Sequence, residues 1–275
     1  MIYLSDERQH AVVVLAALDG SSWETLAPAL TPAPVPAGPA LTADGRLVLA
    51  DRAGSTIVVM TTAGEDPELL DPAGTPVGAL KGPTGVTVDA GGAVYIADTG
   101  NHRIVRASCV DAPGWSAWGT PGTASPGGFL APTGVAVDGA GRVLVTDPAA
   151  HRLVRFDDMT GLNWTELPLP AGATTPYGVR WDTAGALVTE LATRSVLRLH
   201  PDDSASVLID GTDELIAPVA AAADDGTVLV ADAGAAQVTR WAAAGGGWQA
   251  TGRLAGAPGA LPGPEFTRLT GLAVS

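Results

Sequence analysis

Apolar residues recur along this chain in short alternating runs separated by glycine turns, which predicts many short β-strands. The clearest example lies between Gly82 and Arg106, where two strands are joined by a Gly-Gly turn and followed by a polar loop and a third strand. The rest of the chain repeats this unit or completes it. The pattern therefore predicts an all-β fold assembled from repeats.

The repeat is easiest to follow at the acidic residue that ends each second strand. Successive acids lie 42 to 49 residues apart, and the interval taken through the two chain ends is 49 residues. These acids are Asp6, Asp51, Asp98, Asp147, Glu190 and Asp232. Six units of this length, each with about four strands, predict a six-bladed β-propeller.

The two ends of the chain supply complementary parts of one unit. The first fifteen residues are predicted to form a second and a third strand, and residues 269–275 an opening strand. We therefore predict that one blade is built from both N- and C-terminal strands and closes the ring, so that residues 1–275 form a single domain. Closure would also remove the free edges of an open sheet.

Two further features recur within the units. The opening strand of four units follows Pro-x-Gly, as in Pro83-Thr84-Gly85. Four units also place a tryptophan sixteen or seventeen residues after the acid, and we expect this ring to fill the core between blades. The four are Trp23, Trp115, Trp164 and Trp248.

The segment "GPTGVTVDAGGAVYIADTGNHRIVR" resembles the NHL repeat consensus, and "APTGVAVDGAGRVLVTDPAAHRLVRF" is a second close match. The loops from Ser125 to Gly134 and from Leu261 to Gly271 also resemble the way this family leads into a blade. The resemblance spans the chain and is strongest in the third and fourth blades. It implies an NHL-type propeller, a family that includes sensors, scaffolds, RNA binders and a few enzymes, and so defines fold more narrowly than function.

Charge and composition narrow the set of partners. The formal net charge of −14 argues against binding nucleic acid or an anionic membrane through bulk electrostatics. The single cysteine, Cys109, excludes a disulfide within the chain and fits a reducing compartment. No secretory leader pattern opens the sequence, and the aliphatic run of residues 11–18 is too short to span a bilayer. We expect a cytoplasmic monomer.

In this topology, the loops that lead into the first strands share one face with the loops that follow the second strands, around the mouth of the central channel. The residues before the opening glycines are candidate ligand contacts, namely Thr84, Thr133, Tyr177 and Thr270. None of these positions carries the histidine or asparagine that related zinc lyases and lactonases use, so we predict no metal and no cofactor. Streptogramin-lyase-like propellers share Tyr177-Gly178, but a matching set of histidine and glutamate is missing.

Residues that recur in every blade are expected to serve the fold. The acids are predicted to cap loop N–H groups, although the longer Glu190 is expected to be free of that role. The three histidines His10, His102 and His151 open strands of different blades and are predicted to diverge instead of meeting at a metal. The recurring arginines are predicted to pair with carboxylates or to pack along their stems, and they are Arg106, Arg155, Arg198 and Arg240.

The fifth blade breaks the pattern because Arg180 stands where other blades have alanine or threonine. One interpretation is an ion pair between Arg180 and Glu190 that fills space. The other is a ligand site in which Arg180 binds an anionic group, Tyr177 orients it and Glu190 is a base or a second anchor. Arg194 lies in the same blade and is a further candidate.

Two functions remain open from the sequence. The favoured one is a binding, scaffold or sensor module for a protein or small-molecule ligand at the channel mouth. The alternative is a small intracellular enzyme of the lactonase, lyase or cyclase type, with its site in the fifth blade.

Overall fold

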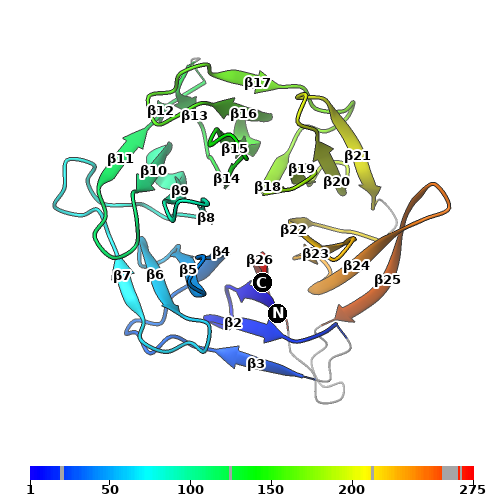
Figure 1. The fold of residues 1–275 in the computed structure, drawn as a ribbon, viewed down its shortest axis with the longest axis horizontal. Coiled ribbons are helices and arrows are strands. Elements are labelled where there is room, and N and C mark those ends of the chain that lie inside the picture. Colours follow the sequence, from blue (N-terminus) through cyan, green and yellow to red (C-terminus); the bar gives the residue numbers. More distant parts are fainter. Residues whose placement is uncertain (19–21, 124–125, 212–213, 256–265, 267) are drawn as a thin grey trace.

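A computed structural model of the chain describes residues 1–18, 22–123, 126–211, 214–255, 266 and 268–275. Six four-stranded antiparallel sheets are arranged as blades around a central axis, which confirms the predicted all-β six-bladed propeller (Figure 1). Ser125 and most of residues 261–267, where two of the loop resemblances fall, lie outside the described residues.

Each blade runs from an inner strand near the central axis to an outer strand at the outside of the propeller. From the inside outward, blade one consists of β26 (Leu269–Val274), β1 (Ile2–Asp6), β2 (Ala11–Leu15) and β3 (Trp23–Leu26). Blade two consists of β4 (Pro36–Leu41), β5 (Arg46–Asp51), β6 (Thr56–Thr61) and β7 (Glu68–Leu70). Blade three consists of β8 (Gly85–Val88), β9 (Val94–Asp98), β10 (Arg103–Ala107) and β11 (Trp115–Trp118). Blade four consists of β14 (Gly134–Val137), β15 (Val143–Asp147), β16 (Arg152–Phe156) and β17 (Thr165–Leu167). Blade five consists of β18 (Pro176–Asp182), β19 (Gly185–Glu190), β20 (Ser195–Leu199) and β21 (Ala205–Asp210). Blade six consists of β22 (Pro218–Asp224), β23 (Thr227–Asp232), β24 (Gln237–Ala244) and β25 (Gly247–Ala255).

A few short elements lie outside this scheme. Two single 3₁₀ turns, Thr99–Asn101 and Pro148–Ala150, follow the second strands of blades three and four. A short parallel pair, β12 (Thr120–Pro121) with β13 (Gly128–Phe129), connects these two blades. The described residues include no helix with the length and apolar character needed to cross a bilayer.

The ring is closed by strands from both ends of the chain, as predicted. β26 pairs antiparallel with β1, with Leu272 opposite Leu4 and Val274 opposite Ile2. The two termini lie side by side near the axis (Figure 1). The first blade therefore depends on residues that are as far apart in the sequence as the chain allows.

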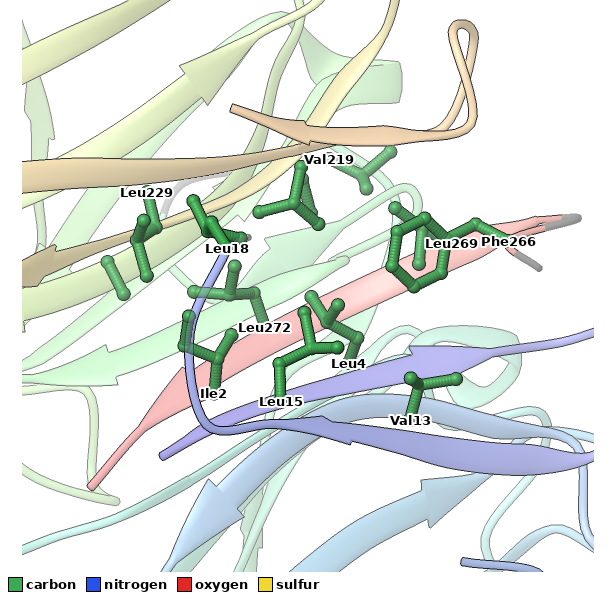
Figure 2. Packing of buried hydrophobic residues seen from close by; sticks show 13 residues of the cluster. Ile2, Leu4, Val13, Leu15, Leu18, Val219, Leu229, Phe266, Leu269 and Leu272 are labelled. Carbon is green, nitrogen blue, oxygen red and sulfur yellow. The ribbon is translucent and has the colours of Figure 1, made fainter. Parts of the chain in front are cut away.

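The hydrophobic core is divided among the interfaces between blades. Figure 2 shows the cluster between blades six and one, where Val219 and Leu229 face Ile2, Leu15 and Leu272. Five similar clusters occupy the other interfaces. Because each sheet buries both faces, its two middle strands are apolar on both sides.

The four recurring tryptophans fill the core between blades only in part. Trp164 packs against Trp118, Phe129 and Phe156, with ring centroids 5.1 to 6.0 Å apart. Trp115 and Trp248 are half-buried against their clusters. The prediction is wrong for Trp23, whose side chain is 40% exposed on an outer strand.

The acids that end the second strands cap loop N–H groups, as predicted. Asp51 accepts hydrogen bonds from the N–H groups of Val35, Ala53 and Gly54, and Asp232 from four loop N–H groups. These carboxylates are buried, and each ties the loop after one strand to the loop that leads into the same blade. The acids thereby fix the geometry of the channel mouth.

Candidate functional site

The inner strands surround a cavity of about 80 Å³ at the centre of the ring. It extends from rim residues such as Glu7 and Arg52 down to Arg180 on β18. All four candidates in the ring of residues before the opening glycines line it, namely Thr84, Thr133, Tyr177 and Thr270. The cavity therefore brings together most of the positions that the sequence singled out.

The three threonines join neighbouring blades. The hydroxyl of Thr84 donates to the carbonyl of Thr133 at 3.0 Å, and that of Thr133 donates to the carbonyl of Tyr177 at 2.9 Å. The hydroxyl of Thr270 donates to the carbonyl of Pro36 at 2.8 Å. Because each hydroxyl proton is used between blades, these side chains can accept a hydrogen bond from a ligand but have none to donate.

Arg180 is the unusual group of the cavity. Its guanidinium donates no hydrogen bond and forms no ion pair within the described residues, and Asp182 is the charged residue that acts on it electrostatically. Asp182 already accepts two 2.7 Å hydrogen bonds from Nη1 of Arg198. Burial lowers the pKa of Arg180, and the attraction of Asp182 only partly opposes this. A half-buried guanidinium without a partner is costly, because its lost hydration is not replaced.

Tyr177 lies three residues before Arg180 on the same strand. Its hydroxyl makes no hydrogen bond to a described residue, although the ring packs against the cluster between blades six and one. Burial raises the pKa of this hydroxyl, while Arg52 and Arg268 act to lower it. The phenol therefore stays protonated and can donate at neutral pH.

Glu190 is not a free carboxylate, so the expectation that it escapes the capping role is wrong. It accepts hydrogen bonds from the N–H groups of Thr174, Thr175 and Thr193 and from the Thr193 hydroxyl. Burial acts to raise the pKa of Glu190, but these bonds together outweigh it and hold the pKa below the usual value. With four bonds its acceptor positions are filled, so the proposed ion pair with Arg180 does not form.

Arg194 and the histidines lie outside the cavity. Arg194 is exposed in a left-handed turn, with φ of 54°. His10, His102 and His151 occupy the same left-handed position in other blades, and Nδ1 of each contacts a backbone carbonyl of the next blade at 2.7 to 3.0 Å. They diverge, as predicted, and the described residues contain no group of three acidic, histidine or cysteine side chains that could hold a metal.

The recurring arginines mostly pair as predicted. Arg155, Arg198 and Arg240 contact Asp203, Asp182 and Asp224. Arg106 differs, because it lies over the ring of Tyr95 and donates to its hydroxyl at 3.1 Å.

Three charged residues at the mouth were missed by the sequence analysis. Glu7 and Arg52 each directly follow a capping acid, and Arg268 precedes the inner strand of blade one. Oε2 of Glu7 lies 3.2 Å from Nε of Arg268 and 3.8 Å from Nη1 of Arg52. The usable signal was the position after the acid, which carries a charge only in blades one and two.

Comparison with protein families decides the classification. The family model of the NHL repeat matches residues 80–106, which form the inner half of blade three and its leading loop. The chain is an NHL-repeat propeller. No curated protein sequence matches this NHL-repeat propeller significantly.

Solved structures support the same fold. A nidogen/laminin complex contains a chain with a TM-score of 0.77 and 18% identity, over 98% of this chain and 96% of that one. Virginiamycin B lyase from Staphylococcus aureus gives 0.68 and 17%, over 91% and 80%. A streptogramin B lyase gives 0.60 and 15%, over 92% and 72%. At these identities the likeness of the NHL-repeat propeller to them concerns the fold alone.

Proposed function

We propose that this NHL-repeat propeller is a binding module that holds the anionic group of a small-molecule ligand in its central channel. The observation that carries the proposal is the guanidinium of Arg180, which lines the cavity without a partner among the described residues. Tyr177 adds an unpaired hydroxyl three residues away on the same strand. A carboxylate, phosphate or sulfate group would satisfy both.

The titratable groups of the cavity favour binding over turnover. Among the described lining residues they are Glu7, Arg52, Tyr177 and Arg180. Glu7 lies against two arginines, and Tyr177 holds its proton more tightly than a free phenol. Glu190, the candidate base from the sequence, is fully engaged by the loops around it. General acid–base catalysis needs a group that exchanges its proton near neutral pH, and neither the tightly held proton of Tyr177 nor the loop-bound carboxylate of Glu190 supplies one.

Thermal shift and calorimetry on wild type, Arg180→Met and Tyr177→Phe test the proposal, with acetate, inorganic phosphate, sulfate and a panel of anionic metabolites as probes. A ligand at about 100 times its dissociation constant should stabilise the wild type by about 2.7 kcal/mol. Arg180→Met should weaken binding by tenfold or more, and Tyr177→Phe several-fold. Arg8→Gln is the matched control, because Arg8 is exposed on the same face and outside the cavity.

The stability of Arg180→Met in the absence of ligand gives an independent test. Because Arg180 makes no ion pair or hydrogen bond to a described residue, Arg180→Met should leave the free energy of unfolding unchanged or raise it by up to about 1 kcal/mol. Binding that is equal in wild type and Arg180→Met would overturn the proposal. So would a clear loss of stability in that variant without any ligand effect, since Arg180 would then be structural.

A further inference from the structure

A second positive site lies at the rim of the same cavity. Arg52 follows the capping acid of blade two, and Arg268 leads into the inner strand of blade one. Their side chains are 51% and 54% exposed, and both lie against the single carboxylate of Glu7. Among the described residues, Arg180, Arg52 and Arg268 thus lie in or beside the cavity with the single glutamate Glu7, in a chain of net charge −14.

The ionic contacts between the carboxylate of Glu7 and these two arginines lack good hydrogen-bond geometry. Its Oε2 is buried and accepts no hydrogen bond from the described residues, although both guanidinium groups lie within 4 Å of it. Neither guanidinium donates a side-chain hydrogen bond to another described residue. Charge attraction without aligned N–H···O bonds is weaker than a bidentate arginine–carboxylate pair, so a better-oriented carboxylate would compete with Glu7.

The lining of the cavity combines threonine side chains with apolar ones. The apolar members include Val86, Val135, Val179 and Leu272, each from a different blade. Tyr177 and Arg180 are three residues apart on β18, so the backbone of Arg180 lies up to about 10 Å further along the strand than that of Tyr177. The cavity therefore has a positive group at its rim and another inside, with aliphatic and threonine side chains between them.

We infer that the ligand is a dianion with an apolar middle, of the α,ω-dicarboxylate type. One carboxylate binds Arg180 inside the channel, and the other binds Arg52 and Arg268 at the rim in place of Glu7. This inference rests on the proposed function, because it needs Arg180 to bind the first anionic group. It adds the second group, the spacing between the two and the role of Glu7 as an internal competitor.

Calorimetry with matched acids tests the second group. The probes are succinate, glutarate, adipate, pimelate and suberate, each compared with the straight-chain monocarboxylate of the same carbon number. We expect the affinity of the diacids to pass through a maximum with length, and the best diacid to bind at least about tenfold more tightly than its monoacid.

Variants at the rim test which residues cause the diacid to bind more tightly than its monoacid. In the double variant Arg52→Gln with Arg268→Gln, the diacid should fall to the affinity of the monoacid, whose own binding stays unchanged. In Glu7→Gln the diacid should bind more tightly, again with no change for the monoacid. Arg8→Gln is the control for general loss of positive charge on this face, and circular dichroism verifies the fold of each variant.

Each outcome separates the two proposals. Monoacids that bind in an Arg180-dependent way, with no advantage for any diacid, would overturn the dianion and leave the proposed function standing. A diacid advantage that survives in the double rim variant would also overturn it. If no acid of either series binds, while another anion binds through Arg180, the apolar dicarboxylate class is wrong and the channel site remains.

Discussion

Glu190 performs with a longer side chain the task that aspartate performs in the other five blades. Its two oxygens accept bonds from Thr174 and Thr175 in the loop that leads into the blade, and from Thr193 in the loop that follows. The extra methylene therefore does not release the carboxylate towards the channel. A residue type that changes within a repeat can still keep its function when the loop around it adjusts.

The capping role of Glu190 predicts a pH-dependent loss of stability. Glu190→Gln should lower the free energy of unfolding by about 2 kcal/mol at neutral pH, because an amide N–H₂ would face the Thr193 N–H. The folded-state pKa of Glu190 is depressed, so its contribution is present above the unfolded value near 4.5 and is lost as the pH falls through the folded pKa. Urea unfolding from pH 7 down to pH 3 should therefore show the two curves converging at acidic pH.

The exposed Glu68 on β7 is a matched control for that measurement. Glu68→Gln should change the stability by less than about 0.5 kcal/mol at any of these pH values. A constant difference between wild type and Glu190→Gln across the whole range would contradict the assigned role.

At the residue scale, the sequence identifies a site only where one blade departs from the others. Arg180 was recognisable because alanine or threonine stands at its position in other blades. The cluster of Glu7, Arg52 and Arg268 was not, because Glu7 and Arg268 come from opposite ends of the chain and meet only when the ring closes. The ion pair expected for Arg180 was wrong because register alone does not show that loop N–H groups already saturate Glu190.

The Pro-x-Gly motif at the start of the inner strands has a steric cause. A Cβ atom built on Gly85 would lie 2.3 Å from the carbonyl oxygen of Thr133, and one built on Gly178 would lie 2.3 Å from that of Val219. Inner strands of neighbouring blades approach backbone to backbone at this point. Neither Gly85 nor Gly178 has a positive φ, so backbone conformation does not require glycine at these positions. Glycine is needed because there is no space for a side chain.

Substitution of this glycine should therefore weaken the contact between two blades. We expect Gly85→Ala to lower the free energy of unfolding by about 1–3 kcal/mol through overpacking. Gly247→Ala on β25 is the control, because nothing lies within 4 Å of its Cβ position and its φ is not positive. There, the reduced freedom of the unfolded chain should stabilise the protein by about 0.4–1 kcal/mol. Thermal denaturation of both variants measures the contrast, and equal midpoints would refute the steric explanation.

Elements that follow the repeat were predictable from the sequence, and those between repeats were not. Alternating apolar positions and glycine turns gave the four strands of each blade. The parallel pair β12 and β13 depends on a loop that only two blades share, and the cluster of Trp118, Phe129, Phe156 and Trp164 forms around it. Trp23 follows the same spacing as Trp164, but its side chain is exposed on the outer strand of blade one.

At the scale of the whole molecule, stability resides in interfaces that run around a circle. Each core cluster combines residues of two adjacent blades, as in the cluster that joins blades six and one (Figure 2). In an open array of repeats an end can unfold alone, because each unit contacts only its neighbours. Closure by β26 gives every blade two neighbours, which should couple the ring into one cooperative unit.

Removing residues 271–275 tests this coupling. The deletion takes Leu272 and Ala273 out of the interfaces on both sides of blade one and leaves β1 without its inner partner. Loss of a buried leucine alone costs about 2–5 kcal/mol, and a change of 1 kcal/mol shifts the midpoint by about 2–4 °C in a chain of this size. We therefore expect the melting temperature to fall by ten degrees or more, in a single transition.

Hydrogen exchange of β15 and β16 in blade four, which lies across the ring, distinguishes unfolding of the whole ring from local fraying of blade one (Figure 1). If their amides lose protection together with those of β2, the ring unfolds as a whole. If they keep wild-type protection while β2 exchanges freely, blade one frays locally and the closing strand serves only the channel wall.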